Sequence, residues 1–421
     1  MLSRRNFLKT GAAVAASSVA LPAFAKGSKI KIGYVSPQSG PLSAFAQADA
    51  YVIENFLKKA AEAGFDVEVI AKDSQSNPNR AAEVARELIV RDEVNLICVA
   101  STPETTNPVC TIAEAEEIPV ISSVAPWQPW FIGQQGNPND PASWQEFDYV
   151  HHFFWGLEDN VGVFMNMWDK FDSNKSVGAL WPNDGDGNAW ASDVGMPPAL
   201  AAAGYNLTDP GRFQNLTDDF SAQINAFKQN NCEIMVGIPI PPDFTTFWTQ
   251  AKQQGYNPKM VSVAKALLFP ESIAALGELG HNLTCEVWWS PNHPYVSSLT
   301  GQTCADLAGE FEDYAGRQWT MPLGFVHALF EVALDALKRA EDPTDGDEMA
   351  ELIGSTNLDT AVGKIQWGRD NVPPFAAANV SKTPLVGGQW RMQDDGSYDL
   401  VIVENGLAPE IPLTGELETL S

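Results

Sequence analysis

Basic residues are scarce in this sequence. The 421 residues include 26 Lys and Arg against 53 Asp and Glu, which gives a formal net charge of −27. Arg4, Arg5 and Lys9 lie in the first 25 residues, which hold no acid, so the rest of the chain carries about −30. So acidic a chain cannot bind nucleic acid by counterion release, and it offers no large basic face to anionic lipid. We therefore expect no nucleic-acid partner, and an acidic, well-solvated surface accounts for the charge.

The sequence also lacks the common catalytic motifs. It contains no G-x-S-x-G, no H-E-x-x-H, no P-loop and no G-x-G-x-x-G after a strand. None of its five histidines has a convincing Ser or Cys partner by spacing; they are His151, His152, His281, His293 and His327. We therefore expect no catalytic residue and no cofactor. An exported hydrolase is the weaker alternative.

Cysteine is rare, with five in the chain, and there is no C-x-x-C and no Cys/His cluster with metal spacing. Cys98 lies in an apolar run and is predicted to be a buried small hydrophobe. Cys285 and Cys304 flank a loop-rich segment, so they are the pair we expect if a disulfide forms. The stretch DGDGN at 184–188 matches a Ca²⁺ loop poorly in its Gly spacing and lacks the final Glu, so no metal is expected.

The N-terminus has the parts of an export signal. Arg4 and Arg5 are followed by a mild apolar stretch over 11–21 and by small residues at Ala23 and Ala25. The stretch is shorter than the ~20 strongly apolar residues of a membrane span. S-R-R-N-F-L-K closely resembles the twin-arginine signal, which implies export of a folded protein by the twin-arginine translocase to the periplasm. We expect residues 1–25 to be removed, and no cysteine near that site would carry a lipid anchor.

Apolar strands alternate with amphipathic helices along the remaining chain. Strands are predicted over 30–36, 67–72, 96–100 and 119–123, and helices over 44–63, 79–92 and 109–117. A second cycle starts near Val161, with strands over 177–181, 233–238 and 260–263. About 396 residues exceed the size of one core, so two α/β domains are expected. The segment 127–155 is rich in Pro, Gly and aromatics, and is either functional or an inserted flap.

Three stretches resemble a known family. They are IKIGYVSPQSGPLSAF, AKDSQSNPNRAAEVARELI and VNLICVASTPETTNPVCTIAEAEEIPVISS, and FVHALFEVALDAL and VGKIQWGRDN agree with them. The pattern resembles the type I periplasmic solute-binding proteins of ABC transporters, the Leu/Ile/Val-binding group. The resemblance implies two Rossmann-like, doubly wound lobes joined by three crossovers, with 29–148 and 291–360 in lobe 1 and 149–290 and 361–421 in lobe 2. Ligand would bind between the lobes, at the carboxyl ends of the strands.

In lobe 1 the resemblance places ligand contacts in three loops. Phe45 falls where the family has an aromatic side chain over the ligand, or else it is an apolar residue of a helix's first turn. Val124 and Trp127 follow the next strand, where a Pro at 126 removes a donor. The hydroxyl-rich loop, which either holds a ligand carboxylate or caps a helix, contributes Ser101, Thr102, Glu104 and Thr105.

In lobe 2 the corresponding loops supply the other candidates. Trp181 would stack on a planar or cationic ligand. Lys265 falls near the position of the acid that holds the ligand ammonium in the amino-acid receptors, and no acid is present there. Lys265 is then either a partner for an anionic group or a surface lysine. The remaining candidates of this lobe are Asp184, Asp186 and Ile240, and Phe325 is a further candidate at the start of the long helix that faces the cleft.

These departures favour a carboxylate-bearing aromatic or otherwise apolar solute over leucine. A quaternary-ammonium compound, an amide or a urea stays open. The expected role is that of a monomeric periplasmic receptor that delivers a solute to the permease and ATPase of an ABC importer. A ligand-binding sensor subunit would share the fold, and the sequence does not separate the two roles.

Overall fold

The first lobe is built on a six-stranded parallel sheet. The computed structural model describes residues 29–420. The strand order is β14-β5-β4-β3-β1-β2. The strands are β1 (Ile30–Ser36), β2 (Val67–Asp73), β3 (Leu96–Ala100), β4 (Val120–Ser123), β5 (Val150–Phe153) and β14 (Val380–Ser381). Because helices cover both faces, β3 and β4 are buried along their whole length, as expected for a central parallel strand.

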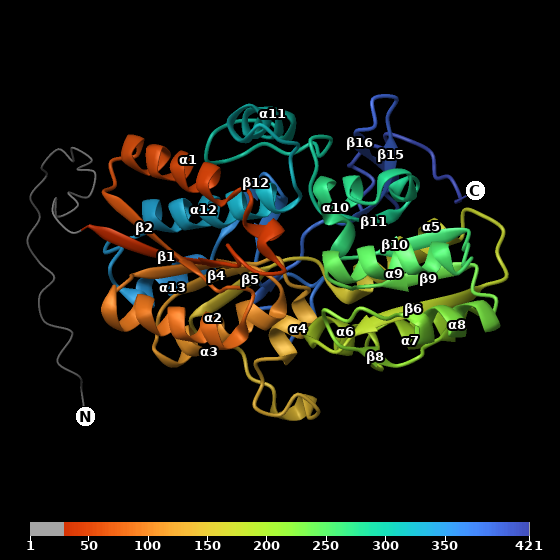
Figure 1. Ribbon diagram of the computed structural model, residues 1–421. Coiled ribbons are helices and arrows are strands. Elements are labelled where there is room, and N and C mark those ends of the chain that lie inside the picture. Colours follow the sequence, from red (N-terminus) through yellow and green to blue (C-terminus); the bar gives the residue numbers. More distant parts are fainter. Residues whose placement is uncertain (1–28, 421) are drawn as a thin grey trace, which may run out of the picture.

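Helices lie on both faces of this sheet, with α1 and α12 on one face and α2 and α3 on the other (Figure 1). The long α12 is almost wholly buried, which explains its run of apolar residues. The helices of this lobe are α1 (Asp49–Glu62), α2 (Pro78–Arg86), α3 (Pro103–Ala115), α4 (Trp127–Ile132), α11 (Cys304–Ala315), α12 (Pro322–Arg339) and α13 (Gly346–Gly354).

The second lobe contains an eight-stranded sheet with the order β16-β15-β11-β10-β9-β6-β7 and with β8 beside β6. All pairs are parallel except β11–β15 and β15–β16. The strands are β6 (Ser176–Pro182), β7 (Asn206–Thr208), β8 (Arg212–Phe213), β9 (Ile234–Gly237), β10 (Met260–Val263), β11 (Thr284–Val287), β15 (Val386–Met392) and β16 (Tyr398–Glu404). The helices are α5 (Leu157–Trp168), α6 (Gly185–Trp190), α7 (Met196–Ala202), α8 (Ser221–Gln229), α9 (Pro241–Gln253) and α10 (Pro270–Ala274). The predicted fold class, two doubly wound α/β lobes, is therefore confirmed.

The chain passes between the lobes three times: after β5, between β11 and α11, and between β14 and β15. The predicted lobe boundaries differ from the strand pairing at two places. β5 and β14 fall within 149–290 and 361–421, the ranges that the resemblance places in lobe 2. Both strands instead pair within the sheet of lobe 1. A separate hairpin of β12 (Asn357–Thr360) and β13 (Gly363–Gln366) precedes the third crossover.

Two predicted helix starts are wrong. α3 begins at Pro103, not at Val109, because a proline suits the first helical position and Pro108 is accommodated inside the helix. The expected helix over 44–63 is split into a 3₁₀ turn over Ser43–Ala46 and α1 from Asp49. In both places the first helical turn consists mostly of polar or small residues, which give no apolar periodicity from which a helix start could be predicted.

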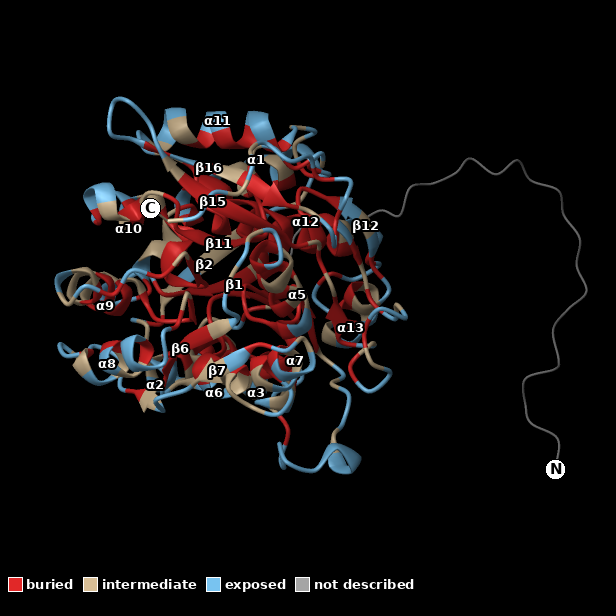
Figure 2. Ribbon diagram, turned by 90° about the vertical axis from the view of Figure 1, so that its right-hand side faces the viewer, coloured by how far each residue is buried: buried red, intermediate tan, exposed pale blue. Residues whose placement is uncertain are grey.

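The aromatic-rich segment after β4 forms α4 and then a protruding loop with one 3₁₀ turn, Pro141–Ser143 (Figure 1). Residues 136–143 are all exposed, and Figure 2 shows this loop projecting from the buried body. We call residues 136–148 the flap. Asn379 holds its base, since its side chain bonds the backbone N–H and C=O of Phe147.

The five cysteines are buried free thiols, so the expected pairing of Cys285 with Cys304 is wrong. Cys285 lies inside β11 of the second lobe, whereas Cys304 starts α11 and donates to the carbonyl of Ala361 at 3.3 Å. Cys98 is fully buried in β3, as predicted. Between residues 29 and 420, no helix is long and apolar enough to cross a membrane.

Candidate ligand-binding site

A small cavity lies between the two lobes, at the carboxyl ends of their strands. Its volume of about 20 Å³ is enough for roughly one water molecule. Lobe 1 and the first crossover contribute Phe45, Thr102, Val124, Pro126, Phe154 and Trp155, and lobe 2 with the second crossover contributes Asp186, Ile238, Lys265, Leu268, Glu286 and Trp288. The cavity therefore sits where ligands bind in doubly wound folds.

The lobes are closed over this cavity. The rings of Phe45 and Phe269, one from each lobe, meet edge to face with centroids 4.9 Å apart. The Gln47 amide donates to Oε2 of Glu271 at 2.8 Å. On the α3 side, the Glu104 carboxylate accepts the backbone N–H of Gly185 at the start of α6. Apolar and polar contacts thus join the lobes around the cavity mouth.

Two cavity residues have strained backbones. Val124 follows β4 with φ of 73°, although β-branched residues rarely adopt positive φ. Lys265 follows β10 with φ of 62° and ψ of −58°, and the N–H of Ala266 donates to the carbonyl of Ala264 at 2.6 Å. These angles and this bond define a classic γ-turn, a rare and strained conformation. Strain of this kind clusters at functional sites, and here one strained residue comes from each lobe.

Lys265 is the charged centre of the site. Its ammonium lies 2.6 Å from Oδ2 of Asp186 and 3.4 Å from Oδ2 of Asp184, and all three side chains are less than a tenth exposed. Burial alone would lower the pKa of Lys265, but the nearby carboxylates of Asp184, Asp186 and Glu104 raise it above its ordinary value. Burial raises the pKa of Asp186 despite this partner. Lys265 is therefore not a surface lysine, and its charge is already matched inside the protein.

An acid does face the site, contrary to the expectation from the sequence. Glu286 lies in β11, beside β10, and is 1% exposed. Burial raises the pKa of its carboxyl from 4.5 to about 8, while the backbone N–H of Lys265 opposes the rise. The parallel register pairs Ser262 with Thr284, which brings Glu286 level with the residue before Lys265. A strand-end acid in the run TCEVWW is the sequence signal that could have identified it.

Five polar atoms of the cavity wall are buried without a hydrogen-bond partner. They are Thr102 Oγ1, Trp155 Nε1, Asp186 Oδ1, Glu286 Oε2 and Trp288 Nε1. Buried polar atoms in proteins are almost always bonded, so each unpartnered atom calls for an explanation. Because both donors and acceptors of both lobes converge on one cavity, a bound solute would satisfy them together.

Aromatic rings form the rest of the wall. Phe154 packs against Trp155 with centroids 4.7 Å apart and edge to face against Trp288 at 5.0 Å. Phe325 lies behind them, 5.0 Å from Phe154 and 5.1 Å from Trp288, and supports the cavity without lining it. Sequence alone did not single out Phe154, Trp155 or Trp288, although aromatic pairs at strand ends (FFW, WW) were the available signal.

Of the residues predicted for the site, the structure brings Phe45, Thr102, Val124, Asp186 and Lys265 together in the cavity wall. Glu104 and Asp184 lie just outside this wall. The charges of both raise the pKa of Lys265, and the charge of Asp184 also raises the pKa of Asp186.

The remaining predicted residues lie away from the cavity wall. Trp181 is fully buried in lobe 2, 5.6 Å from Trp190, because its position in β6 directs it into the core. Trp127 donates to Glu158 at 3.2 Å and packs near Phe375. Ser101 and Thr105 bond each other at 2.6 Å, and Ile240 is the buried residue that precedes α9.

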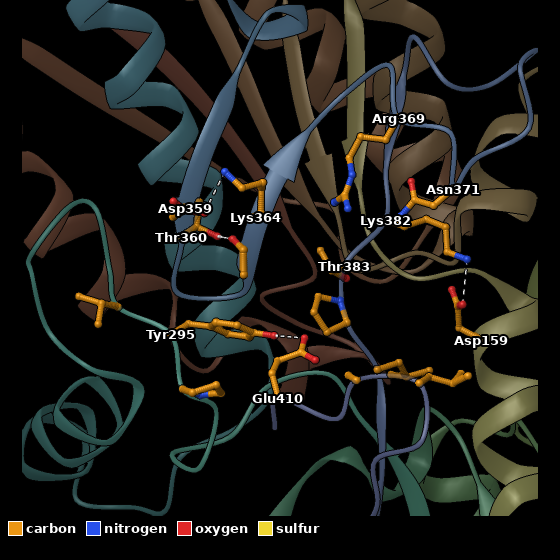
Figure 3. A pocket seen from close by; sticks show the side chains of 17 residues that line it. Asp159, Tyr295, Asp359, Thr360, Lys364, Arg369, Asn371, Lys382, Thr383 and Glu410 are labelled. Atoms are coloured by element: carbon orange, nitrogen blue, oxygen red, sulfur yellow. Dashed lines mark hydrogen bonds and ion pairs between the residues drawn. The ribbon is translucent and has the colours of Figure 1, made fainter. Parts of the chain in front are cut away.

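Larger hollows lie elsewhere, and two of them border the crossovers and the flap. One of about 670 Å³ borders the second and third crossovers, where Tyr295 donates to Glu410 at 3.1 Å and Lys382 pairs with Asp159 at 2.8 Å (Figure 3). The other, of about 830 Å³, is a mostly apolar groove between α3, α4, α6 and the flap, and includes Trp144. The flap thus borders this outer groove and contributes nothing to the wall of the inner cavity.

The structure gives no metal site in the DGDGN stretch. Asp184 caps α6 by accepting the N–H of Gly187 at 2.8 Å, and Asp186 is paired with Lys265. Across residues 29–420, no group of three or more His, Cys, Asp or Glu side chains is placed to hold a metal ion.

Comparison with known proteins agrees with this architecture. The family model described as periplasmic binding protein matches residues 29–382, and the model of the twin-arginine translocation signal matches residues 1–20, which lie outside the described part of the chain. No curated protein sequence matches the chain.

Solved structures share the fold at low identity. A leucine-binding protein, LivK, of Thermotoga maritima MSB8 is 19% identical with a TM-score of 0.72, covering 90% of this chain and 99% of its own. LivJ of Streptococcus pneumoniae, solved with isoleucine, is 16% identical with a TM-score of 0.70, and the match covers 90% of this chain and 100% of LivJ. A solute-binding protein of Rhodopseudomonas palustris BisB5, solved with 3,4-dihydroxybenzoic acid, is 17% identical with a TM-score of 0.70. The match covers 91% of this chain and 99% of that protein. The chain therefore belongs to the periplasmic binding protein family, and its twin-arginine signal sends it to the periplasm.

Proposed function

We propose that the protein captures one small organic solute in the cavity between its lobes and delivers it to the permease of an ABC importer. The observation that carries this proposal is the convergence of five unpartnered polar atoms from both lobes on one closed cavity. A solute that bonds atoms of both lobes binds the closed form best and so shifts the open–closed equilibrium towards it. The permease then receives the closed, loaded form.

The residues of the cavity suit the binding of a solute and not its chemical conversion. Its wall holds no Ser, Cys or His, so it supplies no nucleophile paired with a histidine base. Its only hydroxyl, on Thr102, has no base hydrogen-bonded to it. The protein would act as a monomeric receptor and release its solute unchanged.

The cavity alters the preference among solutes. The sequence favours a carboxylate-bearing compound only if Lys265 is free and no acid faces the site. In the structure Lys265 is paired with Asp186, and Glu286 lines the cavity, so neither condition holds. The aromatic walls still favour an apolar body. Since the closed cavity has room for about one water molecule, any organic solute needs the lobes to open further, and a short molecule needs the least opening.

A thermal-shift experiment tests the proposal. The mature chain, residues 26–421, is refolded to remove any solute that co-purifies, and is screened with amino acids, aromatic acids, amines, amides and urea. A solute at ~100 times its Kd adds about 2.7 kcal/mol to the free energy of unfolding, a plain rise in Tm. Thr102→Val should remove the shift, whereas Thr111→Val, at an exposed position of the same helix, should keep it. A shift that Thr102→Val leaves intact contradicts a site in this cavity.

A further inference from the structure

The charge of the cavity favours one class of solute, given that the cavity is the binding site as proposed above. Four carboxyl groups surround it: Glu104, Asp184, Asp186 and Glu286. Lys265 is the one cation of the wall, and Asp186 and Asp184 already occupy its ammonium. An anionic solute would therefore enter a region of excess negative charge with no free cation to meet it.

Glu286 is the acid of the cavity wall without a salt-bridge partner. Its Oε2 atom is buried, lines the cavity and accepts no hydrogen bond. The charged or polar groups that face it are the backbone N–H of Lys265, the amide of Asn160 and the carboxylate of Asp186. Leaving such a carboxylate ionised in a dry site is costly unless a cation with N–H donors binds it. Asp186 Oδ1 is a second free acceptor beside it.

The aromatic wall is compatible with the same class. Phe45, Phe154, Trp155 and Trp288 surround the cavity, and the faces of such rings attract a cation most strongly where water is excluded. The two indole N–H groups and the Thr102 hydroxyl remain as donors for one uncharged oxygen of the solute. A quaternary ammonium ion would leave both free carboxylate oxygens without a donor, so a nitrogen with N–H groups fits better.

We propose that the solute is a small protonated amine or amidine without a carboxylate, whose N–H groups donate to Glu286 Oε2 and Asp186 Oδ1 and whose apolar body packs among Phe45, Phe154, Trp155 and Trp288. This class differs from the isoleucine and 3,4-dihydroxybenzoic acid found in two proteins of similar fold, both of which carry a carboxylate.

Isothermal titration calorimetry with matched probes tests the class. Amines from methylammonium to butylammonium and acetamidinium are each compared with the amide and the carboxylate of the same size, and with leucine and tetramethylammonium. We expect at least one amine or amidine to bind 100-fold or more tightly than its amide, and its carboxylate not to bind. If every amine and amidine binds no better than its amide or carboxylate, the inference is wrong.

The amine's binding should also release protons. Because the pKa of Glu286 is raised to about 8 in the free protein, a bound cation must displace its proton at pH 7. Titrations in buffers of different ionisation enthalpy measure this release in the wild type, and the amide should give none. Glu286→Gln should abolish the release and weaken amine binding at least 30-fold more than amide binding, whereas Glu278→Gln, a change at a more distant acid, should do neither. An amine that binds without proton release contradicts the role of Glu286 even if the variant does not fold.

The two proposals fail differently. If leucine, a carboxylate or an amide binds tightest and Thr102→Val removes that binding, the receptor proposal holds and the cation inference falls. If a probe binds and Thr102→Val has no effect on it, the cavity itself is excluded as the site.

Discussion

Lys265 and Asp186 form an ion pair, 2.6 Å between Nζ and Oδ2, whose side chains are 4% and 2% exposed. A strained γ-turn presents the lysine from the end of β10, and the start of α6 presents the aspartate. The pair neutralises the one cation of the cavity wall, so the wall keeps no free cation for an anionic solute.

Replacing Lys265 by Met should destabilise the protein strongly. The change leaves Asp186 buried without a partner, which costs about 3–5 kcal/mol in comparable buried pairs. Urea unfolding followed by circular dichroism measures the free energy of unfolding. Lys259→Met is the control, because its pair with Glu233 at 3.0 Å is partly exposed and should be worth less than about 1 kcal/mol. Equal losses in the two variants would contradict the central role of the buried pair.

Glu286→Gln should change how stability depends on pH. The folded-state pKa of Glu286 is raised from 4.5 to about 8, so the native protein keeps this carboxyl protonated up to about pH 8 whereas the unfolded chain ionises above pH 4.5. The associated stability is fully present below pH 4.5 and is lost as the pH rises from there through 8. Glutamine stays neutral, and the variant should therefore gain on the wild type across this window, by up to about 5 kcal/mol. Urea midpoints at pH 4.5, 6.5 and 8.5 give the difference, which should be smallest at pH 4.5. A difference that is constant with pH would show that Glu286 is not the titrating group.

Glu104→Gln should weaken closure of the lobes. The Glu104 carboxylate accepts the N–H of Gly185 across the cleft, and a bond to a charged group is worth about 1.5–3 kcal/mol. Because the Glu104 side chain is partly exposed, solvent reduces the free energy of this bond, and we expect solute affinity to fall about tenfold. The control is Glu116→Gln, at the exposed end of the same helix. Small-angle scattering should show that the loaded variant is less compact than the loaded wild type, and unchanged scattering together with unchanged affinity would rule out this closing contact.

Shortening the flap should leave solute binding intact. Replacing residues 138–142 by Gly-Ser removes part of the outer groove but no residue of the inner cavity. The base stays in place, since Asn379 bonds Phe147 and not the deleted tip. Calorimetry with any solute found in the screen should give a Kd within threefold of the wild type. A tenfold loss would mean that the flap takes part in binding.

Thiol counting tests the state of the cysteines. All five are buried and free, so Ellman's reagent should detect almost none in the native protein and five per chain in guanidinium chloride without reductant. Three thiols per chain under the same conditions would indicate that a disulfide forms.

Much of the fold was predictable from the sequence. Buried parallel strands read as continuous apolar runs, and β3 and β4 were recognised in this way. Helix starts near proline could not be predicted in this way. The run STPETTNP has the composition of a loop, yet it contains the first turn of α3. Short edge strands such as β14, with two residues, carry too little pattern to be assigned to a sheet.

The cavity was predictable only in part. Thr102, Asp186 and Lys265 lie in the segments that follow predicted strands, where the fold places ligand contacts. Glu286 reaches the site because β11 pairs with β10, a neighbour relationship that depends on tertiary packing. Trp181 failed as a candidate because a strand's last residues alternate between core and cleft, and its side chain faces the core.

A crystal structure of the protein with the solute that it carries from the periplasm tests the central claim most directly. The account predicts the solute in the cavity between the lobes, with a donor atom within about 3.2 Å of Glu286 Oε2 and its apolar part against Trp155 and Trp288. A solute seated instead in the hollow beside Tyr295 and Lys382, with the inner cavity still closed and empty, would contradict it.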